Sequence, residues 1–192
     1  MDVNDILEFV KNMRVKEHAI VFYSRPEDKH KILLNFVKAG LDRGESVGYA
    51  AGGEPPESLR EAMRKFGIDV ERYESSGCLK IMSEIHIKDG VAEPSEIISR
   101  WRMLYNEAAE MGLKGLRATG ETDHFFYKNL VKELIKYEEA LHRGLDFPMT
   151  SLCGYNAEIV AKHDRGQLYL DLIRAHRTVI FIGPEGGLIK RI

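Results

Sequence analysis

The chain has 192 residues, 44% of them hydrophobic, and carries a formal net charge of −2 with acidic and basic residues interspersed. This is enough chain for one domain with a sizeable core, and it lacks the one-sided basic face expected of a nucleic-acid-binding protein. No apolar run is long enough to cross a bilayer and the N-terminus does not resemble a secretion signal, so we expect a cytoplasmic protein without membrane or direct nucleic-acid contacts.

The chain begins with an expected amphipathic helix within residues 1–14. Asn4 or Asp5 can cap it, and its apolar stripe must pack against a sheet edge or a partner. We expect residues 18–182 to form one α/β core and residues 183–192, which begin Gly-Pro-Glu-Gly-Gly, to form a tail.

Residues 18–54 have the pattern of a βαβ unit. The apolar run 19–23 predicts a buried strand, residues 32–41 recur with helical period, and residues 47–51 predict a second strand. Two strands joined in this way lie parallel with a right-handed crossover. Ligands of such sheets usually bind where strand carboxyl ends meet helix amino ends, which here is residues 24–31.

Strands and helices continue to alternate along the rest of the chain. We expect strands at 78–82, 116–119, 149–154 and 178–182, and helices from Pro55-Pro56 to Gly67, from Pro94-Ser95 to Gly112, over 125–142 and around 168–173. This order is typical of a three-layer α/β fold with a mostly parallel sheet flanked by helices.

Four candidate site residues lie at predicted strand carboxyl ends, which meet at one edge of a parallel sheet. They are Tyr23, Glu121, Cys153 and Tyr155. His18 lies at the other end of its strand, where we expect a structural role, and Glu138 beside Tyr137 is expected on a solvated helix face.

The chemistry of these residues stays open on sequence alone. Glu121 can bind a ligand or a metal, or only favour the start of the next helix, where Asp123 can act as a cap. Cys153 has no Cys-x-x-Cys partner, no His pair at ligand spacing and no adjacent base. We therefore expect no catalytic residue and no metal, with Cys78 and Cys153 as reduced, buried thiols, and His176 as a cation at the end of the last helix.

Residues 31–82 resemble RecA-superfamily ATPases of the circadian-clock KaiC type. Those ATPases bind phosphates with a glycine-rich P-loop, where this chain has SRPEDKHK. Pro26 removes an amide donor, and Glu27 and Asp28 repel phosphate. Glu54 takes the place of the family's catalytic carboxylate and is expected at the surface. We therefore expect neither ATP nor Mg²⁺ as a cofactor, and no ATP hydrolysis.

A longer resemblance is to the MEDS domain, the sensory domain named after methanogens, methylotrophs and the regulator DcmR. It is carried, in order, by His18 with FY, AGLDRGESVGYA, SGCLKI, KDG, LRATGE, the pair Tyr137-Glu138, LCGY and LIRAH. That family resembles the KaiC-like fold without its P-loop. The resemblance adds His18 and Glu138 to Tyr23, Glu121, Cys153 and Tyr155 as candidate ligand-binding residues.

The resemblance implies a non-enzymatic sensor of small hydrocarbon or methylated or halogenated one-carbon derivatives. In DcmR the domain accompanies a DNA-binding segment, and here we expect only the sensory part, acting through a partner protein and able to form a homo-oligomer. Two alternatives remain: a RecA-like relative that still binds nucleotide, and an assembly module.

Overall fold

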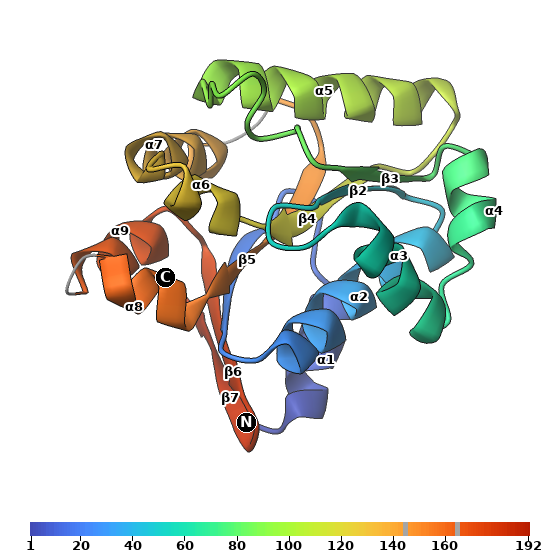
Figure 1. Ribbon diagram of the computed structural model, residues 1–192. Helices are drawn as coiled ribbons and strands as arrows, with labels where there is room; N and C mark the ends of the chain where they lie inside the picture. The colour runs from blue at the N-terminus through green and yellow to red at the C-terminus, as the bar shows by residue number, and fades with distance from the viewer. Residues whose placement is uncertain (144–145, 164–165) are drawn as a thin grey trace.

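The computed structural model of the chain has a central sheet covered by helices on both sides, and it describes residues 1–143, 146–163 and 166–192 (Figure 1). The seven strands run in the order β3-β2-β4-β5-β1-β6-β7. All neighbouring strands are parallel except β6 and β7. The expected α/β fold with a mostly parallel sheet is therefore confirmed.

The strands follow the predicted apolar runs closely. Their bounds are β1 (His18–Tyr23), β2 (Ser46–Ala50), β3 (Leu79–Met82), β4 (Leu116–Glu121), β5 (Met149–Asn156), β6 (Thr178–Gly183) and β7 (Gly186–Arg191). Strands β1, β2 and β4 are buried along their whole length. Both faces of these strands are covered, which explains why they read as continuous apolar runs rather than alternating patterns.

The helices divide between the two faces of the sheet. They are α1 (Val3–Lys11), α2 (Pro26–Asp42), α3 (Pro56–Lys65), α4 (Val70–Ser75), α5 (Pro94–Glu110), α6 (Asp123–Tyr127), α7 (Val131–His142), α8 (Ala157–His163) and α9 (Gln167–Arg174). Helices α1 to α4 pack on one face, called the α2 face below, and α5 to α9 pack on the other, called the α7 face.

Alternation along each strand sends neighbouring side chains into different cores. In β1, Val21 and Tyr23 belong to the core of the α2 face, whereas Ile20 and Phe22 belong to the core of the α7 face. Residues close together in the sequence can therefore belong to sites on opposite sides of the sheet.

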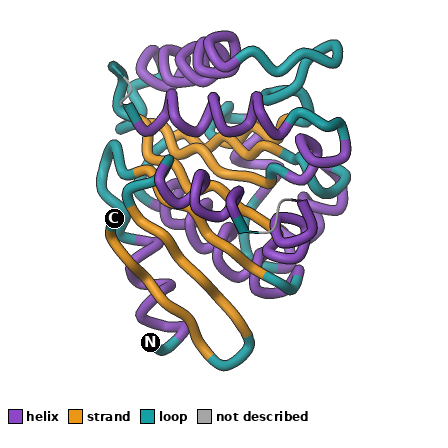
Figure 2. The backbone as a smooth tube through the Cα atoms, turned by 90° about the vertical axis from the view of Figure 1, so that its left-hand side faces the viewer, coloured by secondary structure: helices purple, strands orange, loops and turns teal. Residues whose placement is uncertain are grey.

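The C-terminal segment is not a tail. Residues Gly186–Arg191 form β7, which pairs antiparallel with β6 as a hairpin at the sheet edge (Figure 2). Helix α1 covers this edge, where the amide of Gly187 donates to the carbonyl of Met1. The expectation of a tail at 183–192 is wrong. The glycine-rich start of this segment gives no strand pattern in the sequence, and β7 is defined by its pairing with β6.

The predicted helix 125–142 is two helices. The chain leaves α6 through Asn129, whose φ is 56°, and enters α7 at Val131. Helix α8 was not predicted. Helix α2 begins at Pro26, more than one turn before the apolar period at 32–41, because proline is favoured in the first turn of a helix. No helix in the described part of the chain has the length and apolarity to cross a membrane.

Candidate functional site

The six candidate residues do not share one pocket. Tyr23 and Glu121 lie on the α2 face, whereas His18, Glu138, Cys153 and Tyr155 lie together on the α7 face. Convergence of Glu121 with Cys153 and Tyr155 was predicted from their common strand ends. The prediction failed because strand alternation places Glu121 on one side of the sheet and the other two on the opposite side.

The α2-face cluster is an ionic network around Glu121; its members are Lys29, His30, Tyr49, Glu54 and Glu121. The Glu121 side chain is fully buried, and its Oε1 accepts from Lys29 Nζ at 2.9 Å and from the Tyr49 hydroxyl at 2.9 Å. Its Oε2 accepts from the amide of Gly53 at 2.7 Å. Every oxygen of this buried carboxylate is therefore paired, which a buried charge requires.

Lys29 connects Glu121 to Glu54. Its Nζ also donates to Glu54 Oε1 at 3.2 Å, and His30 Nε2 lies 2.9 Å from the same oxygen. Burial lowers the pKa of Lys29, but Glu121 and Glu54 outweigh it and the pKa is raised. The Glu54 side chain is only 17% exposed, so the expectation of a surface residue is wrong.

Asp123 lies beside this network without a matching partner. Burial, and then the charge of Glu121, raises its pKa to about 6. Its Oδ1 has no hydrogen-bond partner among the described residues. Asp123 lies inside α6 rather than at its N-cap, and the Thr122 hydroxyl donates to the carbonyl of Gly154 instead of capping the helix. The expected capping role of Asp123 is therefore wrong.

The α7-face cluster gathers five side chains from distant parts of the sequence: His18, Glu138, Cys153, Tyr155 and His176. Glu138 Oε2 lies 3.1 Å from His18 Nε2 and 3.4 Å from His176 Nε2. Cys153 Sγ lies 3.6 Å from His18 Nε2 and 3.7 Å from Glu138 Oε2. The Tyr155 hydroxyl donates to Glu138 Oε1.

Burial is the largest single influence on the pKa values of His18, Glu138 and Cys153. It lowers the pKa of His18 to about 4, with His176 lowering it further and Glu138 opposing. Burial alone would raise the pKa of Glu138, but the neighbouring histidines bring it below the usual range. Burial and Glu138 together raise the pKa of the Cys153 thiol.

The structure corrects the interpretation of several of these residues. Glu138 is fully buried rather than solvated, because α7 lies across the sheet and turns this residue towards β1 and β5. His18 lies not apart from the other candidates but beside Cys153, since it pairs in register with Ser151 on the neighbouring strand. His176 was interpreted as a cation at the end of a helix, and its place in the cluster was not predicted. The family segment LIRAH, which ends at His176, was the one sequence feature that pointed to this residue. Cys78 and Cys153 are unpaired but only half-buried.

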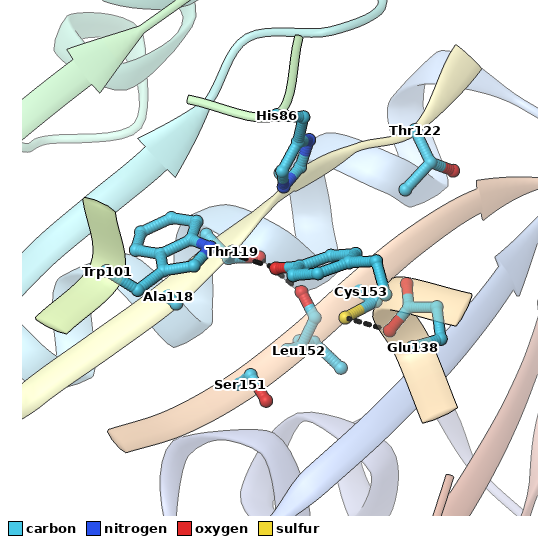
Figure 3. Close-up of a pocket in the computed structure, with 11 residues that line it drawn as sticks. His86, Trp101, Ala118, Thr119, Thr122, Glu138, Ser151, Leu152 and Cys153 are labelled. Atoms are coloured by element: carbon cyan, nitrogen blue, oxygen red, sulfur yellow. Dashed lines mark hydrogen bonds between the residues drawn. The ribbon is translucent and has the colours of Figure 1, made fainter. Parts of the chain in front are cut away.

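A small cavity lies next to the cluster, between the sheet and helices α5 and α7 (Figure 3). Its volume is about 20 Å³, counted as space open to the centre of a water-sized molecule. It is lined by His86, Trp101, Ala118, Thr119, Gly120, Thr122, Tyr137, Glu138, Ser151, Leu152 and Cys153. Trp101 is buried, and its Nε1 donates to the Tyr137 hydroxyl at 2.8 Å. We call this space the α7-face cavity.

The profile of one protein family matches residues 17–177, which include both clusters and the α7-face cavity. That family is the MEDS family, described as the methanogen/methylotroph, DcmR sensory domain. The chain belongs to the MEDS family. MEDS membership assigns it a sensory role in general terms and confirms the resemblance read from the sequence.

Solved structures show the same fold at low sequence identity. A KaiC-like protein from the hyperthermophilic archaeon Pyrococcus horikoshii has a TM-score of 0.66 and 17% identity, covering 93% of this chain and 80% of that one. An uncharacterised protein from the same organism, in complex with an unknown peptide, has a TM-score of 0.70 and 14% identity, covering 100% and 91%. The MEDS domain therefore has a KaiC-like, RecA-type fold. A search of curated proteins found no match.

Proposed function

We propose that this MEDS domain is a non-enzymatic sensor that binds a very small apolar ligand in the α7-face cavity and acts through a partner protein. The ligand class is a hydrocarbon or a methylated or halogenated one-carbon derivative. The observation that carries the proposal is the cavity itself: its walls include the side chains of Trp101, Tyr137 and Ala118, with Cys153 and Glu138 at one side.

The size of the cavity restricts the ligand. A single water needs ~10–15 Å³, so about 20 Å³ admits only one or two groups of this size. A one-carbon compound meets this limit, whereas a nucleotide or a sugar does not. Apolar walls with a few polar groups are also typical of small-molecule sites in proteins.

The β1–α2 junction does not favour nucleotide binding. Proline occupies the first turn of α2, and the acidic residues Glu27 and Asp28 stand in the same turn. Asp28 pairs with Arg25, and Lys29 is committed to Glu54 and Glu121. A phosphate at this helix start would have to displace these pairs and approach two carboxylates. This supports a sensor over the alternative of a nucleotide-binding ATPase relative.

The single tryptophan of the chain provides the test, because Trp101 lines the α7-face cavity. Fluorescence of the purified protein should be quenched saturably by dichloromethane, whereas collisional quenching would rise linearly without saturation. Ala118→Leu fills the cavity and should remove the saturable component. Ala62→Leu, on α3 at the opposite face, is the matched control and should retain it.

Melting temperatures of both variants are measured alongside, so that loss of binding is separated from loss of folding. An equal response in Ala118→Leu would contradict the location of the site. Saturable stabilisation by ATP with Mg²⁺, accompanied by turnover, would contradict the sensor proposal itself.

A further inference from the structure

The α7-face cluster contains four donor atoms of the kinds that transition metals bind. They are His18 Nε2, Glu138 Oε2, Cys153 Sγ and His176 Nε2, and all lie within 4.8 Å of one another. Imidazole nitrogen, thiolate sulfur and carboxylate oxygen are the usual protein ligands of zinc. The assembly is buried, and its members come from β1, α7, β5 and the α9–β6 connection.

The distances between donors agree with tetrahedral coordination. Zinc bonds of ~2.0–2.3 Å at the tetrahedral angle separate nitrogen and oxygen donors by ~3.4 Å, and sulfur from either by ~3.6 Å. Four of the six separations are 3.1 and 3.4 Å for nitrogen to oxygen, and 3.6 and 3.7 Å from sulfur to His18 and Glu138, whereas the two from His176 to His18 and Cys153 are within 4.8 Å. These four separations suit a tetrahedral metal ion.

His176 provides an independent observation. Its Nδ1 lies 2.7 Å from the carbonyl oxygen of Leu172, so Nδ1 carries a proton and donates it. In the neutral ring, Nε2 then has a lone pair, and this atom is buried without a hydrogen-bond partner among the described residues while it faces Glu138 Oε2. A cation between these two atoms would pair with both lone pairs.

The surroundings of Glu138 and His176 match the outer shell of a metal site. Histidine ligands commonly donate their second ring N–H to a carbonyl, as His176 does to Leu172, and ligating carboxylates are themselves hydrogen-bonded, as Glu138 is by Tyr155.

We propose that the α7-face cluster binds one divalent transition metal ion of the zinc type through four protein donors: His18 Nε2, Glu138 Oε2, Cys153 Sγ and His176 Nε2. The Cys153 thiol releases its proton to solvent on binding, so thiolate, carboxylate and metal sum to zero charge. A neutral assembly is the least costly one to bury. This proposal does not depend on what binds in the α7-face cavity.

A second cavity of about 30 Å³ borders His18 and is lined by Lys16, Glu17, His18, Leu141, Met149, Ser151 and Arg177. The cluster thus lies between two cavities, both of which are bordered by Ser151.

Cobalt(II) titration of the chelator-treated protein tests the proposal. We expect one Co²⁺ per chain, with visible ligand-field bands of tetrahedral cobalt and a near-ultraviolet thiolate-to-cobalt band, and displacement of Co²⁺ by Zn²⁺. Cys153→Ser should lose the thiolate band. Cys78→Ser is the matched control, because Cys78 lies outside the cluster, and it should keep both signals.

Two further variants keep the test decisive if Cys153→Ser folds poorly. Glu138→Gln should weaken cobalt binding at least ~10-fold while the thiolate band persists at high cobalt, and Tyr155→Phe should weaken it ~10- to 100-fold with an unchanged spectrum. Absence of saturable cobalt binding to the wild-type chain, or a thiolate band that disappears in Cys78→Ser rather than Cys153→Ser, would overturn the proposal.

Discussion

At the scale of single residues, Glu121 has a structural part in the α2-face cluster. It is fully buried, and its carboxylate is paired with Lys29, Tyr49 and the amide of Gly53. It also lies on the opposite face of the sheet from the α7-face cavity. Its burial and pairing therefore favour a contribution to stability.

Glu121→Gln should lower the free energy of unfolding by about 3 kcal/mol, because it leaves Lys29 with a buried charge that only Glu54 can pair. Urea denaturation measures this change. Glu57→Gln, which removes an exposed partner of Arg64, is the control and should cost less than about 1 kcal/mol. Unchanged stability together with a lost dichloromethane response would instead assign Glu121 to the ligand site.

Asp123 gives the α2 face a pH dependence. The pKa of Asp123 in the folded protein is about 6, above the unfolded value of ~3.9, because burial and the charge of Glu121 raise it. Lys29 opposes this shift, and Tyr23 lies nearby. The folded state therefore holds the proton more tightly. Stability from this group is present at low pH and is lost as pH rises towards 6.

Asp123→Asn should accordingly stabilise the protein at pH 7, by up to ~3 kcal/mol, and the gain should shrink towards pH 4. Denaturation at both pH values measures it. Asp89→Asn replaces an exposed turn residue with φ of 51°, which asparagine also adopts, and should change stability little at either pH. A variant at position 123 that is less stable at pH 7 would contradict the assigned pKa direction.

At the scale of elements, the sequence allowed β1, β2, α2, α3 and α5 to be predicted because each has a strong local pattern of apolar residues and proline or glycine boundaries. Strand β7 has no such pattern: it starts with two glycines and stays half-exposed, so only its pairing with β6 defines it. The break between α6 and α7 was missed because a single left-handed residue, Asn129, produces it.

Asn129 is exposed, so its substitutions report on the backbone rather than on packing. Asn129→Val should destabilise the protein by ~1–2 kcal/mol, because a β-branched residue resists a left-handed conformation. Asn129→Gly, which adopts that conformation freely, should be close to neutral. Chemical denaturation of the two variants tests this, and equal stability would mean that the turn relaxes to another geometry.

The site was less predictable than the fold for a related reason. The prediction that strand ends converge says nothing of which face each side chain takes, and so it wrongly placed Glu121 with Cys153 and Tyr155, which share one face of β5. The pairing of His18 with Glu138 joins residues 120 positions apart and depends on how α7 crosses the sheet. Such contacts leave no local pattern, so Glu138 looked solvated and His176 looked like a simple helix-end cation.

At the scale of the whole molecule, the sheet separates two chemical environments. The α2 face has a closed ionic network in which most charges are paired, whereas the α7 face has a small cavity next to unpartnered donor atoms. A ligand in that cavity would contact Trp101 on α5 and Tyr137 on α7 at once. The two helices therefore provide a route by which binding would reach the protein surface.

Crystals of the protein exposed to dibromomethane, a heavier analogue of dichloromethane, test the location of the ligand site most directly. Anomalous scattering from bromine should appear in the α7-face cavity, between Trp101 and Cys153. Bromine at Lys29 and Glu54 on the other face, or no ordered bromine in the molecule, would contradict it.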